Sequence, residues 1–261
     1  MSETFFSLVT GASRGIGECF ARALAARRHN LILVARSAGA LQGLGSELSQ
    51  RHGIQTEVVE LDLSRISAST LLVRQLSERG LAVDLLVNNA GFAGRGEFWR
   101  LPLDPQMEMV RLHVHTLVEL THHLLAPMVE RRRGGLINVS SLTGFQSIPY
   151  AAVYAASKAF VTSFSMGLAE EVRGYGISVV TLCPGGTRTS LRVIGQAGGG
   201  TFPGRPPAPD EVVEEALKAL DRGGGLVVPR WINKLTVFAH RVLPRGGTAR
   251  LLARLSRPEQ D

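Results

Sequence analysis

Short apolar stretches rich in Val, Ile and Leu alternate along the chain with longer stretches in which apolar residues recur at helical spacing. This alternation is typical of a parallel sheet that helices cover on both faces. The apolar stretches predict seven strands, at residues 5–9, 30–35, 55–61, 84–88, 135–140, 177–183 and 225–228. The periodic stretches predict helices at residues 16–28, 38–51, 68–79, 105–132, 153–174 and 210–222. We therefore expect an α/β fold with a doubly wound sheet of seven mainly parallel strands, in one domain that spans residues 1–229.

One long segment interrupts this alternation. Residues 185–209 are rich in Gly and Pro and follow directly after the sixth predicted strand. An irregular segment of this length inside a compact domain is usually either functional or disordered. Because it begins at the carboxyl end of a strand, where ligands bind in such folds, we prefer a substrate lid to a disordered insertion.

The composition narrows the class of protein. Of the 261 residues, 44% are hydrophobic, which is enough to bury the core of one large domain. The two cysteines, Cys19 and Cys183, are far apart and predict no disulfide framework, so a reducing compartment fits best. The first residues show no basic region or cleavage site, and no apolar run approaches the ~18 residues of a membrane-spanning helix. We expect a cytoplasmic protein, and we predict no metal site.

The net charge of +7 belongs to the C-terminal part of the chain. Residues 230–258 contain seven Lys and Arg and no Asp or Glu, so the rest is formally neutral and we expect no nucleic-acid partner. Apolar residues recur at helical spacing within this part, which predicts a basic amphipathic extension over residues 230–261. Such a helix can contact an anionic membrane surface or an acidic partner through residues 230–258, or it can pack on the body or on another subunit.

A glycine-rich turn follows the first predicted strand. Residues 10–17 read Thr-Gly-Ala-Ser-Arg-Gly-Ile-Gly and open the first predicted helix. Glycines here let the backbone turn tightly and approach a pyrophosphate, which then lies on the amides and the positive end of the helix dipole. The spacing Gly-x-x-x-Gly-x-Gly differs from the general dinucleotide fingerprint, so the turn alone is a weak signal.

Further motifs make the chain resemble the short-chain dehydrogenase/reductase family, of the NADP-preferring type with Tyr-x-x-x-Lys, over residues 4–229. Asn88-Asn89-Ala90-Gly91 follows the fourth predicted strand, Asp62 follows the third, and residues 184–189 follow the sixth. The resemblance implies a Rossmann-like sheet, with Asp62 at the adenine ring and residues 184–189 at the nicotinamide. It implies cofactor contacts at Gly11, Ser13, Arg14, Gly15, Ile16, Gly17, Arg36, Asp62, Leu63, Asn89, Ala90, Gly91, Tyr154, Lys158, Pro184, Gly185, Thr187 and Thr189.

The residues after the second strand indicate which nicotinamide cofactor is used. An acidic side chain about 20 residues beyond the glycine turn usually holds the ribose of NAD. Ala35 and Arg36 occupy that place. A carboxylate would repel a 2′-phosphate, whereas a guanidinium pairs with it, and Arg14 supplies a second cation. The predicted cofactor is NADP(H).

The predicted catalytic residues are Ser141, Tyr154 and Lys158, with His113 at a fourth position. Tyr154 and Lys158 are four residues apart on a predicted helix, so they share one face. We expect Tyr154 to protonate a carbonyl oxygen as hydride arrives, with the Lys158 ammonium lowering the pKa of its hydroxyl. Ser141 precedes Tyr154 by 13 residues, which matches the family, and its hydroxyl would donate to the same oxygen. Ser140 is the competing serine, and spacing favours Ser141.

His113 is the clearest departure from the family, which usually has an asparagine at this place in the fourth helix. That asparagine holds water in a proton relay beside the lysine. Imidazole donates and accepts hydrogen bonds and titrates near neutrality, so His113 can maintain such a relay. The other interpretation is a histidine that only packs in the helix, and the sequence leaves both open.

The residues that follow the catalytic motifs are apolar, among them Phe92, Phe145 and Ile148, and this favours a small hydrophobic carbonyl substrate. The resulting hypothesis is an NADPH-dependent oxidoreductase that reduces a hydrophobic ketone or aldehyde, or runs in reverse. A 3-oxoacyl-thioester reductase is an enzymatic alternative, and a non-catalytic NADP(H)-binding regulatory protein is an alternative of another class. The resemblance also implies a homo-dimer or tetramer.

Overall fold

A sheet of seven strands forms the centre of the computed structural model, which describes residues 4–188, 191–195, 206–242 and 245–255. All of the paired strands in these ranges run parallel. Across the sheet the order is β3 (Thr56–Glu60), β2 (Asn30–Ala35), β1 (Phe5–Thr10), β4 (Ala82–Asn88), β6 (Gly134–Val139), β7 (Ile177–Leu182) and β9 (Gly224–Val227). The predicted Rossmann-like, doubly wound α/β fold is confirmed.

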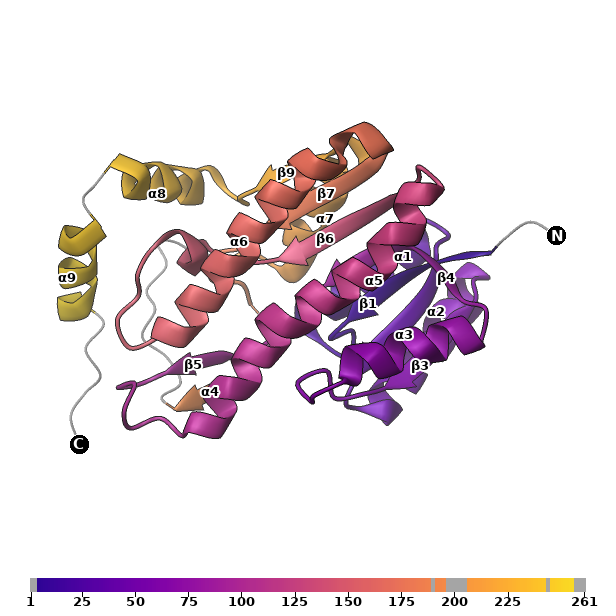
Figure 1. Cartoon of the computed structure of the whole chain (residues 1–261), viewed down its shortest axis with the longest axis horizontal. Helices are drawn as coiled ribbons and strands as arrows, with labels where there is room; N and C mark the ends of the chain where they lie inside the picture. The colour runs from indigo at the N-terminus through magenta and orange to yellow at the C-terminus, as the bar shows by residue number, and fades with distance from the viewer. Residues whose placement is uncertain (1–3, 189–190, 196–205, 243–244, 256–261) are drawn as a thin grey trace.

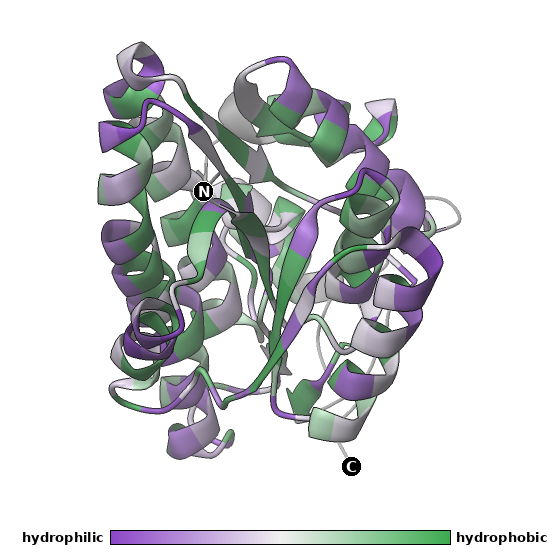
Figure 2. Cartoon of the chain, turned by 90° about the vertical axis from the view of Figure 1, so that its right-hand side faces the viewer, coloured by the Kyte–Doolittle hydropathy of each residue, from purple (hydrophilic) through white to green (hydrophobic). Residues whose placement is uncertain are grey.

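Helices cover both faces of this sheet, and Figure 2 shows the hydrophobic strands between two helical layers. One face packs against α1 (Gly15–Ala26), α2 (Ala38–His52) and α7 (Pro209–Asp221). The other packs against α3 (Ala68–Glu78), α5 (Thr116–Glu130) and α6 (Ala152–Val172). Each layer has its own apolar core, and Phe20 and Leu120 represent the two. Burial on both sides explains why the strands read as continuous apolar runs.

The long helix predicted at residues 105–132 is not uniform. It consists of α4 (Leu103–Val110), a π-helical turn over Arg111–His115, and α5. A π turn inserts an extra residue into the helical repeat and is often found at functional sites. His113 lies within this turn, and its side chain is buried.

The described part of the predicted lid contains a strand that the sequence pattern did not indicate. β8 (Val193–Gly195) pairs in parallel with β5 (Ala93–Arg95), and the amide of Ala93 donates to the carbonyl of Arg192 at 2.9 Å. Two three-residue strands are too short to show an alternating pattern, so they could not be recognised from sequence. The pairing joins the segment after β7 to the segment after β4.

The strand order reverses between β1 and β4, because β2 and β3 extend the sheet on one side and β4 to β9 extend it on the other. Ligands of open α/β sheets bind outside the carboxyl ends of the strands at this switch point. The glycine turn after β1 and residues 89–91 after β4 therefore meet at one place, since β1 and β4, both labelled in Figure 1, are neighbouring parallel strands.

The C-terminal part forms α8 (Trp231–Val242) and α9 (Arg245–Leu255), drawn in yellow at one edge of the molecule in Figure 1. α8 packs on the body through Val237, which is buried in an apolar cluster with Leu142, Cys183 and Val228. Within the described residues, α-helices that combine the length and the apolar character needed to cross a membrane are absent.

Candidate active site

Glycines shape the turn between β1 and α1. Gly11 and Gly15 have left-handed backbone, with φ of +67° and +60°, and the amide of Gly11 donates to the Val34 carbonyl at 2.8 Å. A Cβ on Gly17 would lie 2.2 Å from the carbonyl oxygen of Gly11, a distance that no side chain tolerates. Arg14 stands at the N-cap of α1 with extended backbone and an exposed side chain. This close approach leaves the start of α1 suited to a phosphate group.

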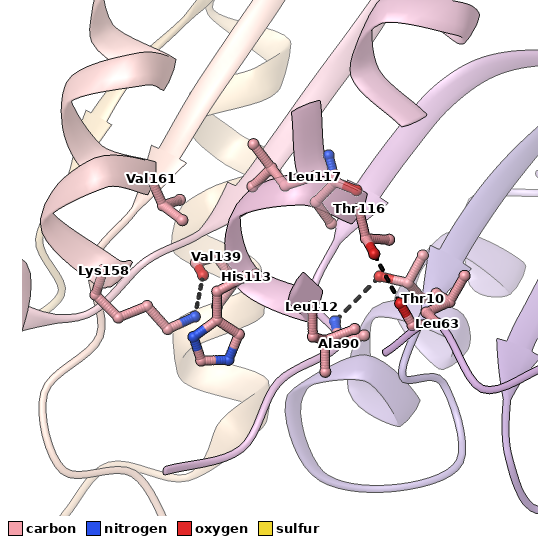
Figure 3. Close-up of a pocket in the computed structure, with 11 residues that line it drawn as sticks. Thr10, Leu63, Ala90, Leu112, His113, Thr116, Leu117, Val139, Lys158 and Val161 are labelled. Atoms are coloured by element: carbon pink, nitrogen blue, oxygen red, sulfur yellow. Dashed lines mark hydrogen bonds between the residues drawn. The ribbon is translucent and has the colours of Figure 1, made fainter. Parts of the chain in front are cut away.

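Hydrogen bonds join this turn to the end of β4. The Thr10 hydroxyl donates to the Val87 carbonyl at 3.1 Å and accepts from the amides of Asn89 and Ala90 at 2.9 and 3.0 Å. The Asn89 side-chain amide donates to the carbonyl of Thr10 at 2.9 Å. Sequence reasoning missed the role of Thr10, although its hydroxyl immediately before the glycines was a usable signal. Figure 3 shows Thr10 and Ala90 on one side of a cavity that His113 and Lys158 line from the other.

Lys158, Tyr154 and Ser141 come together at the carboxyl end of β6. The Lys158 ammonium is buried and donates to the carbonyl of Val139 at 2.8 Å (Figure 3). It lies 5.9 Å from the centre of the Tyr154 ring, and Tyr154 shares a hydrogen bond with the Ser141 side chain. One turn of α6 thus carries the tyrosine and the lysine, while the strand end carries the serine.

The two neighbouring serines, Ser140 and Ser141, have different hydrogen-bond partners. Ser140 is buried and donates to the backbone carbonyl of Lys158 at 2.8 Å, and its oxygen lies 2.7 Å from the hydroxyl of Thr162. Ser141 begins a short 3-10 helix, accepts from the amide of Thr143 at 3.2 Å, and reaches Tyr154. Ser140 holds α6 against the sheet, and Ser141 is the serine that faces the tyrosine.

Burial controls the protonation of the tyrosine and the lysine. It lowers the pKa of Lys158 to about 8. It also raises the pKa of Tyr154, and the hydrogen bond with Ser141 opposes this rise without cancelling it. The expected net lowering of the Tyr154 pKa is therefore not seen, because removal of the phenol from water outweighs the hydrogen bond with Ser141. Tyr154 remains protonated throughout the neutral range.

His113 is held by backbone and side-chain partners on both sides of its ring. Its Nε2 accepts from the amide of Phe92 at 3.3 Å, and its Nδ1 lies 2.9 Å from the hydroxyl of Ser157. Ser157 in turn donates to the carbonyl of Tyr154 at 2.8 Å, so its proton is engaged and Nδ1 of the histidine carries the shared hydrogen. Sequence reasoning missed Ser157, although a serine three residues after Tyr154 on the same helix face was a usable signal.

The charge of His113 follows from this environment. Burial, together with the charge of Lys158, holds the pKa of the imidazole well below its ordinary value. A Cβ on Gly91 would lie 2.7 Å from Nε2, so the ring occupies space that only glycine leaves at that position. His113 is thus a neutral side chain that connects α6 to the chain after β4.

The predicted adenine end presents basic and acidic side chains together. Arg14 and Arg36 are exposed, and Leu63 is buried with its carbonyl accepting from Thr116 at 2.7 Å. Burial alone would raise the pKa of Asp62, but hydrogen bonds from Ser64 and the charges of Arg36 and Arg65 outweigh it and lower the pKa. Asp62 is therefore ionised and close enough to Arg36 to feel its charge.

The segment after β7 borders the same region. The carbonyl of Pro184 accepts from the amide of Leu142 at 2.9 Å, and the Thr187 hydroxyl donates to the carbonyl of Gly185 at 3.2 Å. A Cβ on Gly185 would come within 3.0 Å of the Asn233 side chain of α8. Thr189, a further predicted contact, lies outside the described residues.

A second cavity adjoins Tyr154 on the side of β5 and α4. Its lining includes Phe98, Leu101, Met109, Val153 and Tyr154. Mostly apolar side chains next to a protonated phenol suit a hydrophobic substrate with one polar group. Groups of three or more His, Cys, Asp or Glu that could hold a metal ion are absent from the described part of the chain.

Comparisons with known proteins agree with this geometry. Residues 6–195 match the family model for short chain dehydrogenases. A very-long-chain 3-oxoacyl-CoA reductase of Laccaria bicolor is 32% identical over 246 residues, which are 93% of this chain and 71% of the relative. A structure of a 7beta-hydroxysteroid dehydrogenase superposes with a TM-score of 0.82 at 26% identity, covering 95% of this chain and 96% of the other. A short-chain dehydrogenase from Sphingobium yanoikuyae in complex with NADPH gives 0.80 at 29% identity, covering 98% and 97%.

The buried lysine generates a prediction about stability and pH. The pKa of Lys158 is about 8 in the folded protein and 10.5 ordinarily, so between these values the unfolded chain binds more protons. Raising the pH through this window therefore stabilises the folded state, and Lys158→Met removes the effect. From pH 8 to pH 10, we expect the unfolding free energy of the wild type to rise by about 2 to 3 kcal/mol more than that of the variant. Urea unfolding at several pH values measures these free energies. If they change with pH in parallel in the two proteins, the prediction is wrong.

Proposed function

The chain belongs to the short-chain dehydrogenase family, and from this premise we propose that it is an NADPH-dependent reductase of hydrophobic ketones or aldehydes with Tyr154 as proton donor. The observation that carries the proposal is the position of the Tyr154 hydroxyl, which shares a hydrogen bond with Ser141 and borders an apolar cavity.

The residues at the switch point fit NADPH. Gly11, Gly15 and Gly17 allow a pyrophosphate to approach the start of α1, and the exposed Arg14 and Arg36 suit a 2′-phosphate. The NADPH complex of the Sphingobium relative supports this choice. When bound, NADPH supplies the hydride.

The chain's own groups then act on the carbonyl oxygen. Ser141 donates a hydrogen bond to that oxygen and stabilises the negative charge that develops there. Tyr154 transfers its hydroxyl proton to the same oxygen, so the carbonyl gains one hydride and one proton and becomes an alcohol. Lys158 lies beside the Tyr154 ring with its ammonium on the carbonyl of Val139, and its charge stabilises the phenolate that remains.

A 3-oxoacyl-thioester reductase is the second candidate function. The Laccaria relative, named for very-long-chain 3-oxoacyl-CoA reduction, favours it, as does the apolar cavity beside Tyr154. The assembly of Ser141, Tyr154 and Lys158 argues against a non-catalytic regulatory protein. A cytoplasmic location and a homo-dimer or tetramer stay predictions.

The first test measures turnover. Wild type is expected to oxidise NADPH faster than NADH with hydrophobic ketones, aldehydes or 3-oxoacyl thioesters, and the preferred class separates the two candidate reactions. Tyr154→Phe removes the transferable proton and is expected to lower kcat by about 100-fold or more while NADPH binding persists. The matched control is Tyr175→Phe, because Tyr175 is exposed and distant from the site in sequence. Binding of NADPH by a wild type that turns over no substrate would overturn the proposal.

Cofactor choice is tested at Arg36. Arg36→Ala is expected to lower kcat/KM for NADPH by about tenfold to hundredfold, because a charge-assisted contact to the 2′-phosphate is lost. Values for NADH should change little, since NADH has no phosphate there. Arg51→Ala is the control, as Arg51 is an exposed arginine at the far end of α2. Equal losses with both cofactors would show that Arg36 only supports the fold.

We propose that His113 acts as a neutral positioning residue that fixes the Tyr154 turn through Ser157. His113→Ala should lower kcat more than it changes the KM for NADPH, and His113→Asn should retain more activity because an amide both donates and accepts. The kcat profile between pH 5.5 and 7.5 should have the same shape in wild type and both variants, because the histidine is already neutral there. An acidic limb near the ordinary histidine pKa that His113→Ala abolishes would instead identify a titrating relay.

A further inference from the structure

The outward side of α8 carries three large apolar side chains. Trp231, Leu235 and Phe238 are 71%, 55% and 65% exposed. Their spacing of four and three residues places them on one helix face, which we call the outward face of α8. We propose that the outward face of α8 binds the surface of an anionic lipid membrane.

The opposite side of the same helix is already packed. Asn233 is buried and donates to the carbonyl of Pro229 at 2.7 Å, and Val237 is buried against the body. A helix on the surface of a soluble domain is expected to be apolar on its inner side and polar on its outer side. α8 has apolar residues on both sides, so its core contact does not account for the outward face. Exposed apolar groups that gather in this way indicate an interaction site.

Charge identifies the partner as an anionic surface. Lys234 is exposed on α8 and Arg250 is exposed on α9. The sequence from residue 230 to 258 has seven basic residues and no acidic ones. Tryptophan and phenylalanine beside lysine and arginine are the combination that lies at the boundary of headgroups and acyl chains. Each of these basic side chains also contributes attraction to an anionic leaflet.

A second apolar group on the molecule supplies a comparison. Trp99, Leu103 and Phe98 are 75%, 64% and 57% exposed, so the residue types and exposures nearly match those of α8. Acidic residues accompany them, including the exposed Asp104, and Arg100 pairs with Glu97 at 2.7 Å. An anionic membrane would attract the α8 group and not this one. Comparing the two groups therefore distinguishes binding to an anionic membrane from nonspecific hydrophobic adsorption.

The proposed contact does not depend on the proposed reaction. Its three side chains lie outside the cavities of the site. α8 is nevertheless adjacent to the segment after β7, because the Asn233 side chain limits the space at Gly185. Membrane binding through α8 would therefore hold that side of the active site close to lipid.

Co-sedimentation of the full chain with vesicles tests the proposal. Vesicles of equal parts phosphatidylglycerol and phosphatidylcholine should bind the wild type, and vesicles of phosphatidylcholine alone should bind it weakly. The triple variant Trp231→Ser, Leu235→Ser, Phe238→Ser should weaken binding by about tenfold or more, because three apolar side chains no longer insert. The matched control variant Phe98→Ser, Trp99→Ser, Leu103→Ser should bind within about twofold of the wild type.

Two further measurements keep the result interpretable. Circular dichroism checks that each variant is folded, and Lys234→Glu, a milder change, should also weaken binding to the phosphatidylglycerol vesicles. Salt at about 0.5 M should reduce wild-type binding, since it screens the charges. Absence of wild-type binding, or equal loss in both triple variants, would overturn the proposal. One other result would overturn it. If the wild type forms an oligomer and does not bind vesicles, and the α8 variant no longer forms that oligomer, then the outward face of α8 joins copies of the chain.

Discussion

Thr10 and Asn89 hold together the carboxyl ends of β1 and β4, where the order of the sheet reverses. The Thr10 hydroxyl donates to one carbonyl and accepts from two amides, so one side chain is hydrogen-bonded to three backbone groups of β4 and of the chain after it. With that junction in place, Gly17 can lie against the Gly11 carbonyl and α1 begins at a fixed distance from β4. The phosphate-binding turn and the reaction centre share this junction, so cofactor binding and catalysis rest on the same few hydrogen bonds.

From this junction the site extends across β6 into α6. Lys158 reaches back to the Val139 carbonyl, while Ser140 binds the backbone of the same lysine. His113, which lies within the π-helical turn, connects α6 to Phe92 through Ser157. Burial of these polar groups gives the site its chemistry, since it lowers the pKa of Lys158 and raises that of Tyr154. The same desolvation costs stability and disfavours the charged form of each group.

The segment after β7 links the site to the C-terminal helices. β8 pairs with β5, so this segment is fixed at one point to the chain after β4. Gly185 lies against Asn233, and Val237 packs near Leu142, which places α8 next to the 3-10 helix that follows Ser141. The contact of α8 with a membrane and the approach of a hydrophobic substrate would thus involve neighbouring parts of the surface.

The sequence by itself determined the strands of the main sheet and, to within about two residues, where each lies along the chain, because apolar runs and glycine turns are local features. It also identified Ser141, Tyr154 and Lys158 as candidate catalytic residues, since their spacing is visible along the chain. Only the tertiary structure decided between Ser140 and Ser141, joined Thr10 to Asn89, and buried His113 near the charge of Lys158, which keeps the imidazole neutral. Only packing showed that α8 is apolar on both sides. These are contacts between distant residues, and burial and pKa depend on such neighbours, which no local pattern records.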